Sequence, residues 1–163
     1  MKDESLEADL GEAVATGEAR TKAGELLASS PVGFLALTDD HGPYVVPISF
    51  SYDGEDIYFH GGEGKKSRAL AVEARVCLAV MSEPQLVKGD NACSDNFRSA
   101  SVLVFGHVVP LESAFEKDAA LRTIVAKYHP EVAADQLKPE KVTGTTVYRM
   151  EIRALTYREL PGD

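Results

Sequence analysis

Short runs of alternating or continuous apolar residues recur along most of the chain and indicate β-strands. The connections between these runs are mostly short. No alternation of strand and helix continues long enough for a doubly wound sheet. The pattern therefore predicts a mainly β fold, a small six-stranded antiparallel barrel with peripheral helices. We expect its strands at residues 32–38, 44–52, 56–60, 75–81, 99–110 and 145–160.

Helical periodicity is confined to three segments, residues 21–30, 65–74 and 113–129. In the last of these, Ser113 and Glu116 have the spacing of a capping box, and Pro130 ends the helix. Residues 1–20 are rich in Glu, Ala and Asp. We interpret them as an N-terminal extension of a composition typical of disorder. With 163 residues in all, residues 21–163 form a single domain.

Glycine and proline mark irregular places in this pattern. Pro47 removes a hydrogen-bond donor from the second strand, so that strand lies at an edge, carries a bulge or borders a ligand. Gly106, within the fifth strand, suggests a bulge or the close approach of another backbone. The dipeptide at 53–54, Asp-Gly, predicts a hairpin. Residues 82–98 are the least regular stretch and are expected to form a long functional loop.

Charge and composition exclude several classes of protein. The net charge of −9 disfavours a surface for nucleic acid or anionic lipid, which requires clustered basic residues. No apolar run is long enough for a membrane helix and no signal peptide is recognisable, so we expect a cytoplasmic protein. Cys77 and Cys93 form no CxxC pair, and the four histidines lack metal-binding spacing; Cys77, in an apolar run, is expected to be a buried thiol.

The segment "IYFHGGEGKKSRAL", residues 57–70, joins a strand to a helix through a glycine-rich turn. It fails the P-loop pattern, because Phe59 replaces the first glycine and Lys66 replaces Ser or Thr. A helix N-terminus with Lys65, Lys66 and the Ser67 hydroxyl still has the chemistry to bind a phosphate. The alternative is an exposed turn with two surface lysines. His60 is either a hydrogen-bonded histidine at a strand end or a catalytic group.

Three quoted segments together are similar to a known family. "GFLALTDDHGPYVVPISFSYDGEDIYFHGGEGKKSRAL", "RVCLAV" and "FRSASVLVFGHVVPLESAFEKDAALRTIVAKYHP" resemble the pyridoxamine 5′-phosphate oxidase-like, FMN-binding split-barrel superfamily. The branch that they resemble most is that of the nitroimidazole-resistance (Nim-type) flavoproteins. The resemblance spans about residues 30–155. It implies a six-stranded antiparallel split β-barrel that forms a homodimer, with two FMN sites at the interface.

The resemblance also implies which residues bind the cofactor. By position, residues 45–49 match the strand that lines the flavin ring, and residues 59–61 match the strand end beside it. The lysines at 65 and 66 match the basic residues that hold the phosphate, and the serines at 99 and 101 lie in a strand that adds polar contacts. In the Nim-type branch His60 lies near the flavin, which implies a catalytic role in proton delivery or substrate positioning. The implied FMN-binding residues are Val45, Val46, Pro47, Ile48, Ser49, Phe59, His60, Gly61, Lys65, Lys66, Ser99 and Ser101.

The sequence departs from true pyridoxamine-phosphate oxidases, which carry a C-terminal Trp and Arg that hold the substrate phosphate. This chain has no Trp, and its end "ALTYRELPGD" does not match. We therefore expect an FMN-dependent oxidoreductase that reduces a small, planar substrate, with NAD(P)H as electron donor. The alternative is a non-catalytic flavin or haem protein of the same fold, with His60 or His107 as the haem ligand. A deazaflavin-dependent enzyme is a third option, but it needs a longer tail groove.

Overall fold

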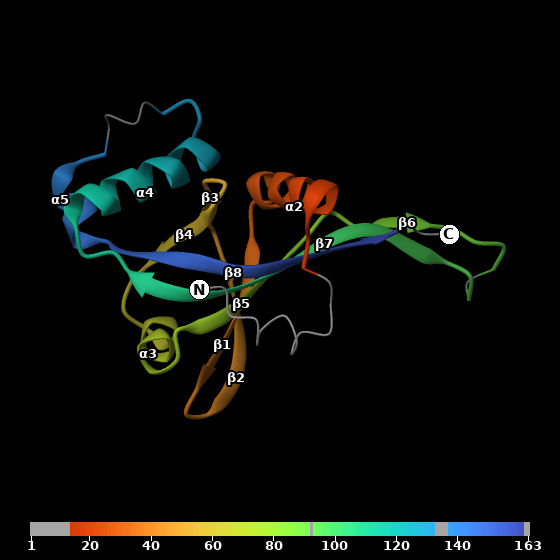
Figure 1. The fold of residues 1–163 in the computed structure, drawn as a ribbon, viewed down its shortest axis with the longest axis horizontal. Helices are drawn as coiled ribbons and strands as arrows, with labels where there is room; N and C mark the ends of the chain where they lie inside the picture. Colours follow the sequence, from red (N-terminus) through yellow and green to blue (C-terminus); the bar gives the residue numbers. More distant parts are fainter. Residues whose placement is uncertain (1–13, 92, 133–136, 162–163) are drawn as a thin grey trace.

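The computed structural model describes residues 14–91, 93–132 and 137–161, which form eight strands and four helices (Figure 1). The N-terminal extension lies mostly outside these residues. The elements, in chain order, are α2 (Gly17–Ser29), β1 (Gly33–Asp39), β2 (Gly42–Ile48), β3 (Ser51–Tyr52), β4 (Asp56–Gly61), α3 (Lys65–Val72), β5 (Arg75–Met81), β6 (Gln85–Val87), β7 (Asn96–Pro110), α4 (Ala114–Tyr128), α5 (Pro139–Gly144) and β8 (Thr146–Leu160).

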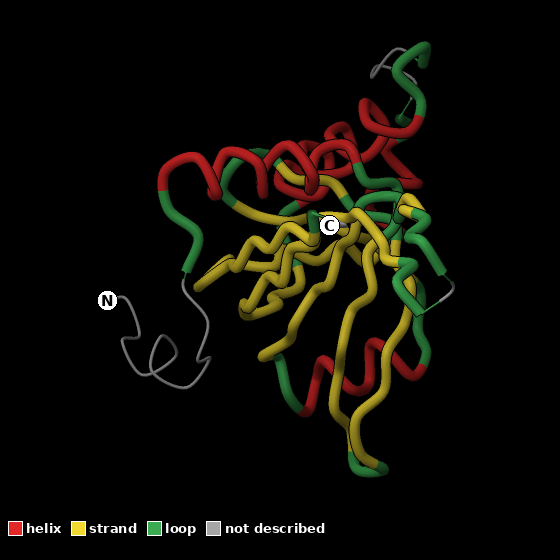
Figure 2. Tube along the Cα trace, turned by 90° about the vertical axis from the view of Figure 1, so that its right-hand side faces the viewer, coloured by secondary structure: helices red, strands yellow, loops and turns green. Residues whose placement is uncertain are grey.

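The strands form one antiparallel sheet in the order β2-β1-β5-β7-β8-β4-β3, with β6 added alongside β7. Helices α2 and α4 lie on one side of the twisted sheet and α3 on the other (Figures 1 and 2). This confirms a mainly antiparallel β fold of the split-barrel type. The sheet is not closed, and its two edge strands, β2 and β3, follow one another in the chain.

The strand count differs from the expected six for two reasons. The predicted strand 44–52 is broken at Ser49 and Phe50, which lie outside both ladders. The Phe50 N–H donates to the Tyr128 hydroxyl at 2.9 Å, so a side chain from α4 replaces a neighbouring strand there. The additional strand is β6, which pairs residue by residue with the first three residues of β7. The predicted loop 82–98 is therefore partly a β-ribbon.

We call this ribbon the arm: β6, residues 96–100 of β7 and residues 158–160 of β8. It extends away from the helices at the right of Figure 1. Its apolar side chains Leu86, Phe97 and Leu160 are exposed. Monomeric proteins rarely expose neighbouring large apolar side chains, so these residues make the arm an unusually apolar surface.

Alternation along the strands sends one set of side chains into a common core. Leu35, Leu78 and Val104 are fully buried there, and α2 closes the core with Leu27. A second, smaller core lies between α4, α5 and β8 and includes Ile124. Burying one such aliphatic side chain stabilises the fold by about 1.5–3 kcal/mol.

Gly106 lies at a bulge, as its position within a long strand predicts. The pairing of β7 with β8 shifts register between Phe105 and Gly106. A Cβ atom at residue 106 would lie 2.4 Å from the Glu151 carbonyl oxygen and 3.0 Å from the Met150 methyl carbon. The close approach of the β8 backbone therefore requires glycine.

The helices differ from expectation at their ends. The first described helix, α2, starts four residues earlier than the predicted 21–30 segment. The predicted capping box of α4 is wrong, because Ser113 is the N-cap but its side chain makes no capping hydrogen bond. The short helix α5 was not predicted. Among the described residues, no helix has the length and apolar character needed to cross a membrane.

Candidate functional site

The end of β4 and the start of α3 form the corner that the sequence singles out. Along β4 the side chains alternate, so that Phe59 is fully buried and His60 is exposed. The Phe59 ring stacks on Tyr148 with a centroid separation of 5.1 Å. Only the backbone of Phe59 is therefore available to a ligand, whereas the His60 imidazole faces solvent.

Lys66 folds back over this corner. Its Nζ donates to the His60 carbonyl oxygen at 3.3 Å and lies 5.2 Å from the centroid of the Phe59 ring. No carboxylate of the described residues lies within ion-pair distance of Lys66, and partial burial lowers the pKa of its ammonium group. A Cβ atom on Gly61 would approach Lys66 Nζ to 2.6 Å, so glycine makes room for the amine. Within the described residues, this cation therefore lacks a counter-ion.

Lys65 has a different environment. Its Nζ lies 3.4 Å from Asp39 Oδ2 and 4.3 Å above the centroid of the Tyr44 ring, while its side chain remains 52% exposed. The His41 N–H donates to Asp39, and this hydrogen bond, with the charge of Lys65, lowers the pKa of the carboxyl group. The charge of Lys65 is therefore partly compensated within the protein.

The helix start supplies further donors, although not the one expected from Ser67. The Ser67 hydroxyl accepts from the Gly64 N–H at 2.9 Å and donates to the Gly64 carbonyl oxygen at 3.0 Å, so it holds the turn together. The N–H groups of Lys65, Lys66 and Ser67, the first three residues of the helix, have no acceptor within the helix. Together with two cations and the positive end of the helix dipole, they fit a phosphate group.

Strand β2 presents the second group of predicted residues. The side chains of Val45, Pro47 and Ser49 are exposed, Val46 is half-buried and Ile48 is buried. Among the described strands β2 pairs only with β1, so its other side carries unpaired backbone groups there. Of the three positions that Pro47 allowed, the structure therefore shows the edge. An unpaired strand edge is a natural place for a planar, hydrogen-bonding ligand.

Ser99 and Ser101 lie elsewhere, on β7, with half-buried side chains. Ser101 pairs with Met81, at the opposite end of β5 from α3, and β7 is three strands from β2 in the sheet. At a strand spacing of about 4.8 Å, that separation is about 14 Å. One chain therefore does not bring these serines together with the corner that holds the lysines.

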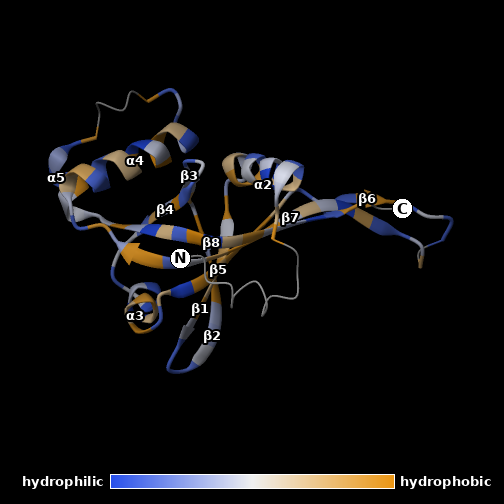
Figure 3. Ribbon diagram, viewed as in Figure 1, coloured by the Kyte–Doolittle hydropathy of each residue, from blue (hydrophilic) through white to orange (hydrophobic). Residues whose placement is uncertain are grey.

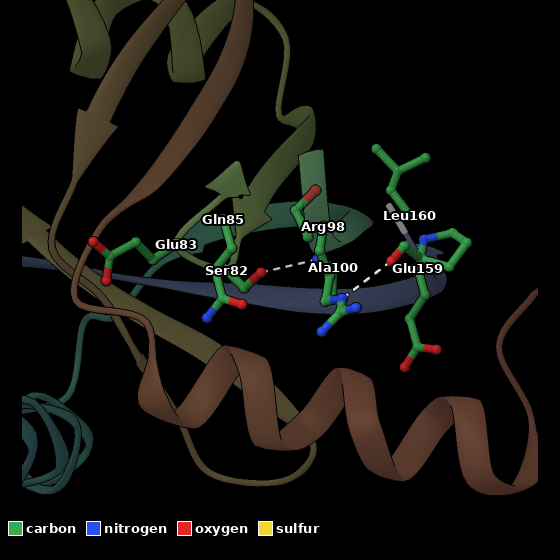
Figure 4. Close-up of a pocket in the computed structure, with 9 residues that line it drawn as sticks. Ser82, Glu83, Gln85, Arg98, Ala100, Glu159 and Leu160 are labelled. Atoms are coloured by element: carbon green, nitrogen blue, oxygen red, sulfur yellow. Dashed lines mark hydrogen bonds between the residues drawn. The ribbon is translucent and has the colours of Figure 1, made fainter. Parts of the chain in front are cut away.

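A cavity of about 690 Å³ lies on the arm beside Ser99 (Figure 4). Ser82 Oγ accepts from the Ala100 N–H at 2.8 Å, and Arg98 Nε donates to the Pro161 carbonyl oxygen at 3.0 Å. These bonds fix the walls of the cavity but leave its mouth open. Its lining comprises Ser82, Glu83, Gln85, Arg98, Ser99, Ala100, Glu159, Leu160 and Pro161.

Two residues of the corner were missed from the sequence, Asp39 and Tyr44. The Tyr44 hydroxyl is buried and has no hydrogen-bond partner among the described residues; burial raises its pKa. Tyr44 alternates with the exposed Val45, so strand periodicity places it on the side of Val46 and Ile48. Nothing local in the sequence places Asp39 next to Lys65, because the pair joins β1 to α3.

The two histidines considered as haem ligands do not meet. His60 pairs with Val147 and His107 with Glu151. These partners are four residues apart on β8, about 13 Å along the strand. Among the described residues, no three His, Cys, Asp or Glu side chains come close enough together to bind a metal. Cys77, expected to be buried, is half-buried, and burial raises the pKa of its thiol.

The open antiparallel sheet, with a corner that carries two lysines beside an unpaired edge strand, is that of the split-barrel class of proteins. A profile of the pyridoxamine 5′-phosphate oxidase family matches residues 19–159. The chain belongs to this family. A comparison with curated proteins gives no match.

Solved structures agree with this assignment. A protein of Bacteroides thetaiotaomicron described as a 5-nitroimidazole antibiotic resistance protein is 27% identical, with a TM-score of 0.76 over 89% of this chain and 85% of that one. An FAD- and haem-binding protein of Mycobacterium smegmatis is 24% identical, with a TM-score of 0.76 over 93% and 76%. An FAD-binding protein of Mesorhizobium loti is 21% identical, with a TM-score of 0.63 over 91% and 97%. The last two likenesses concern the fold alone.

Proposed function

We propose that the protein is an FMN-dependent oxidoreductase that reduces a small substrate and is recharged by NAD(P)H. The observation that carries this proposal is Lys66, at the start of a helix and beside an exposed histidine. It is a partly buried cation for which the described part of the chain offers no carboxylate partner. A bound phosphate supplies the missing counter-charge. A reductase that uses NAD(P)H would act in the cytoplasm.

In this proposal Lys65, Lys66 and the first N–H groups of α3 hold the FMN phosphate. The unpaired edge of β2 from Val45 to Ile48, together with Ser49 just after it, lies along the flavin ring and contacts it mainly through backbone groups. His60 is the catalytic residue, placed to hold or deliver a proton near the substrate. The flavin, when bound, supplies hydride or single-electron transfer to the substrate.

We also propose that the site is completed by a second copy of the chain. The face of the sheet that carries Phe34, Val45 and Met81 is apolar, and these side chains are 50%, 60% and 55% exposed. On β7, Leu103 and Phe105 lie on the same face and are half-buried, within the apolar stretch that Figure 3 shows along this strand. An apolar face of this extent favours a homodimer. Such an interface allows Ser99 and Ser101 of one copy to reach the flavin held by the other.

The absorbance spectrum of the purified protein tests the proposal, followed by mass identification of any released cofactor. Flavin bands and released FMN, with NAD(P)H oxidation in the presence of a nitroaromatic acceptor, are expected. A His60→Ala variant should keep the flavin bands and lose most of the turnover. A colourless protein that takes up neither FMN nor FAD would refute flavin binding.

A non-catalytic flavin or haem protein is the second candidate. The exposed His60 favours it, since an exposed imidazole can ligate iron, and an FAD- and haem-binding protein shares the fold. Titration with haem distinguishes the two functions. A Soret band that disappears in the His60→Ala variant, together with no NAD(P)H-dependent reduction, would establish this alternative.

A further inference from the structure

The last turn of α4 holds the connection between β2 and β3. Tyr128 lies 78 residues from Phe50 in sequence, and its hydroxyl accepts the Phe50 N–H at 2.9 Å. The same hydroxyl lies 2.9 Å from the Phe50 carbonyl oxygen and 2.7 Å from the Pro31 carbonyl oxygen, to either of which it can donate its proton. A single side chain therefore satisfies backbone groups that a continuous strand would have paired.

Neighbouring residues of α4 strengthen this contact. Lys127 Nζ lies 3.8 Å from the centroid of the buried Phe50 ring and donates to the Leu27 carbonyl oxygen at 3.1 Å. One turn earlier, Thr123 Oγ1 and Ser51 Oγ are 2.7 Å apart. Helix α4 thus fixes the backbone and ring of Phe50 and the first residue of β3, and it links them to the end of α2.

The held segment adjoins the proposed flavin site. Ser49, which is exposed, stands between the buried residues Ile48 and Phe50 and belongs to neither ladder. Its position consequently depends on how Phe50 is held. The β2 edge that would carry the flavin ring ends at Ile48, directly before this residue.

We propose that Tyr128 is a positioning residue for the flavin site: its hydroxyl fixes the break between β2 and β3 and so sets the position of Ser49. This inference rests on the proposed function. Without the hydroxyl, the buried Phe50 N–H loses its acceptor, and the segment must move to find another. The flavin would then lose contacts at the end of β2 while the lysine corner remains intact.

A Tyr128→Phe variant tests the proposal, with Tyr52→Phe as the matched control. The Tyr52 hydroxyl also donates to a backbone carbonyl, that of Gly54, at 2.7 Å, but in the following hairpin. We expect Tyr128→Phe to weaken FMN binding about tenfold, in line with the loss of a partly buried hydrogen bond, and to shift the visible spectrum of the bound flavin. Tyr52→Phe should stay within about twofold of the wild type, since its bond is exposed.

Hydrogen exchange completes the test. The Phe50 amide should exchange faster in Tyr128→Phe than in the wild type. Faster exchange with unchanged FMN affinity and spectrum would overturn the proposal. If the variant does not fold, hydrogen exchange of the wild type with and without FMN replaces this test. Bound FMN should then slow exchange of the Phe50 amide, and the absence of slowing would overturn the inference. Absence of FMN binding by the wild type would instead count against the proposed function itself.

Discussion

The two lysines of the corner should contribute unequally to FMN binding, although they are adjacent in sequence. Lys66 has no carboxylate partner among the described residues, whereas Lys65 shares its charge with Asp39 at 3.4 Å. Phosphate would form a new charge-assisted hydrogen bond with Lys66. For Lys65 it would largely replace an existing ion pair.

The expected magnitudes follow from this difference. A hydrogen bond to a charged group contributes about 1.5–3 kcal/mol, so Lys66→Met should weaken FMN binding by about 10- to 150-fold. Lys65→Met should cost less than about 1 kcal/mol, or about fivefold, because exposed, compensated charges contribute little. Asp39→Asn, which frees Lys65 from its partner, should tighten FMN binding.

Fluorescence titration of the flavin-free protein in phosphate-free buffer measures these affinities, and riboflavin is the control ligand. Riboflavin carries no phosphate, so Lys66→Met should leave its affinity unchanged. The substitution should not lower the melting temperature, because burial disfavours the charged form of Lys66, as its lowered pKa shows. Equal losses for FMN and riboflavin, or larger losses at Lys65 than at Lys66, would refute the reasoning.

Three further outcomes are expected. Gly106→Ala should destabilise the fold by about 1–3 kcal/mol in thermal unfolding, since its Cβ meets the Glu151 carbonyl oxygen at 2.4 Å, whereas Gly144→Ala, with nothing within 4 Å, should not. Phe34→Asp should convert a dimer to monomers in light scattering and weaken flavin binding, and Phe115→Asp, at an 82% exposed position on α4, should do neither. Burial lowers the pKa of Lys127 to about 8, below its value in the unfolded chain, so between pH 8 and 10 the unfolded chain binds more protons than the folded protein. The free energy of unfolding should therefore rise over this range by more in the wild type than in Lys127→Met, and equal slopes would contradict this.

The strands were predictable because their signal is local. Alternation along 75–81 and 99–110 reproduces β5 exactly in extent and most of β7, and Pro47 and Gly106 mark an edge and a bulge that the structure confirms. Strand β6 could not be predicted, since its three residues are mostly exposed and carry no periodicity. The ion pair between Asp39 and Lys65 could not be predicted either, because it depends on the packing of α3 against β1.

The break at Ser49 and Phe50 shows most clearly what local patterns omit. The local pattern of residues 44–52 is that of one strand. The side chain that interrupts it, Tyr128 on α4, lies 78 residues from Phe50 in sequence and leaves no mark on that pattern. A closed barrel would use all its backbone groups in ladders. The break instead separates two edge strands. Among the described residues it leaves one side of β2 unpaired, and beyond Tyr58 it also leaves unpaired the side of β4 that faces away from β8. Exposed edges of this kind invite pairing with other chains unless something covers them. A flavin lying along β2, and a second copy of the chain against the apolar face, would together cover them.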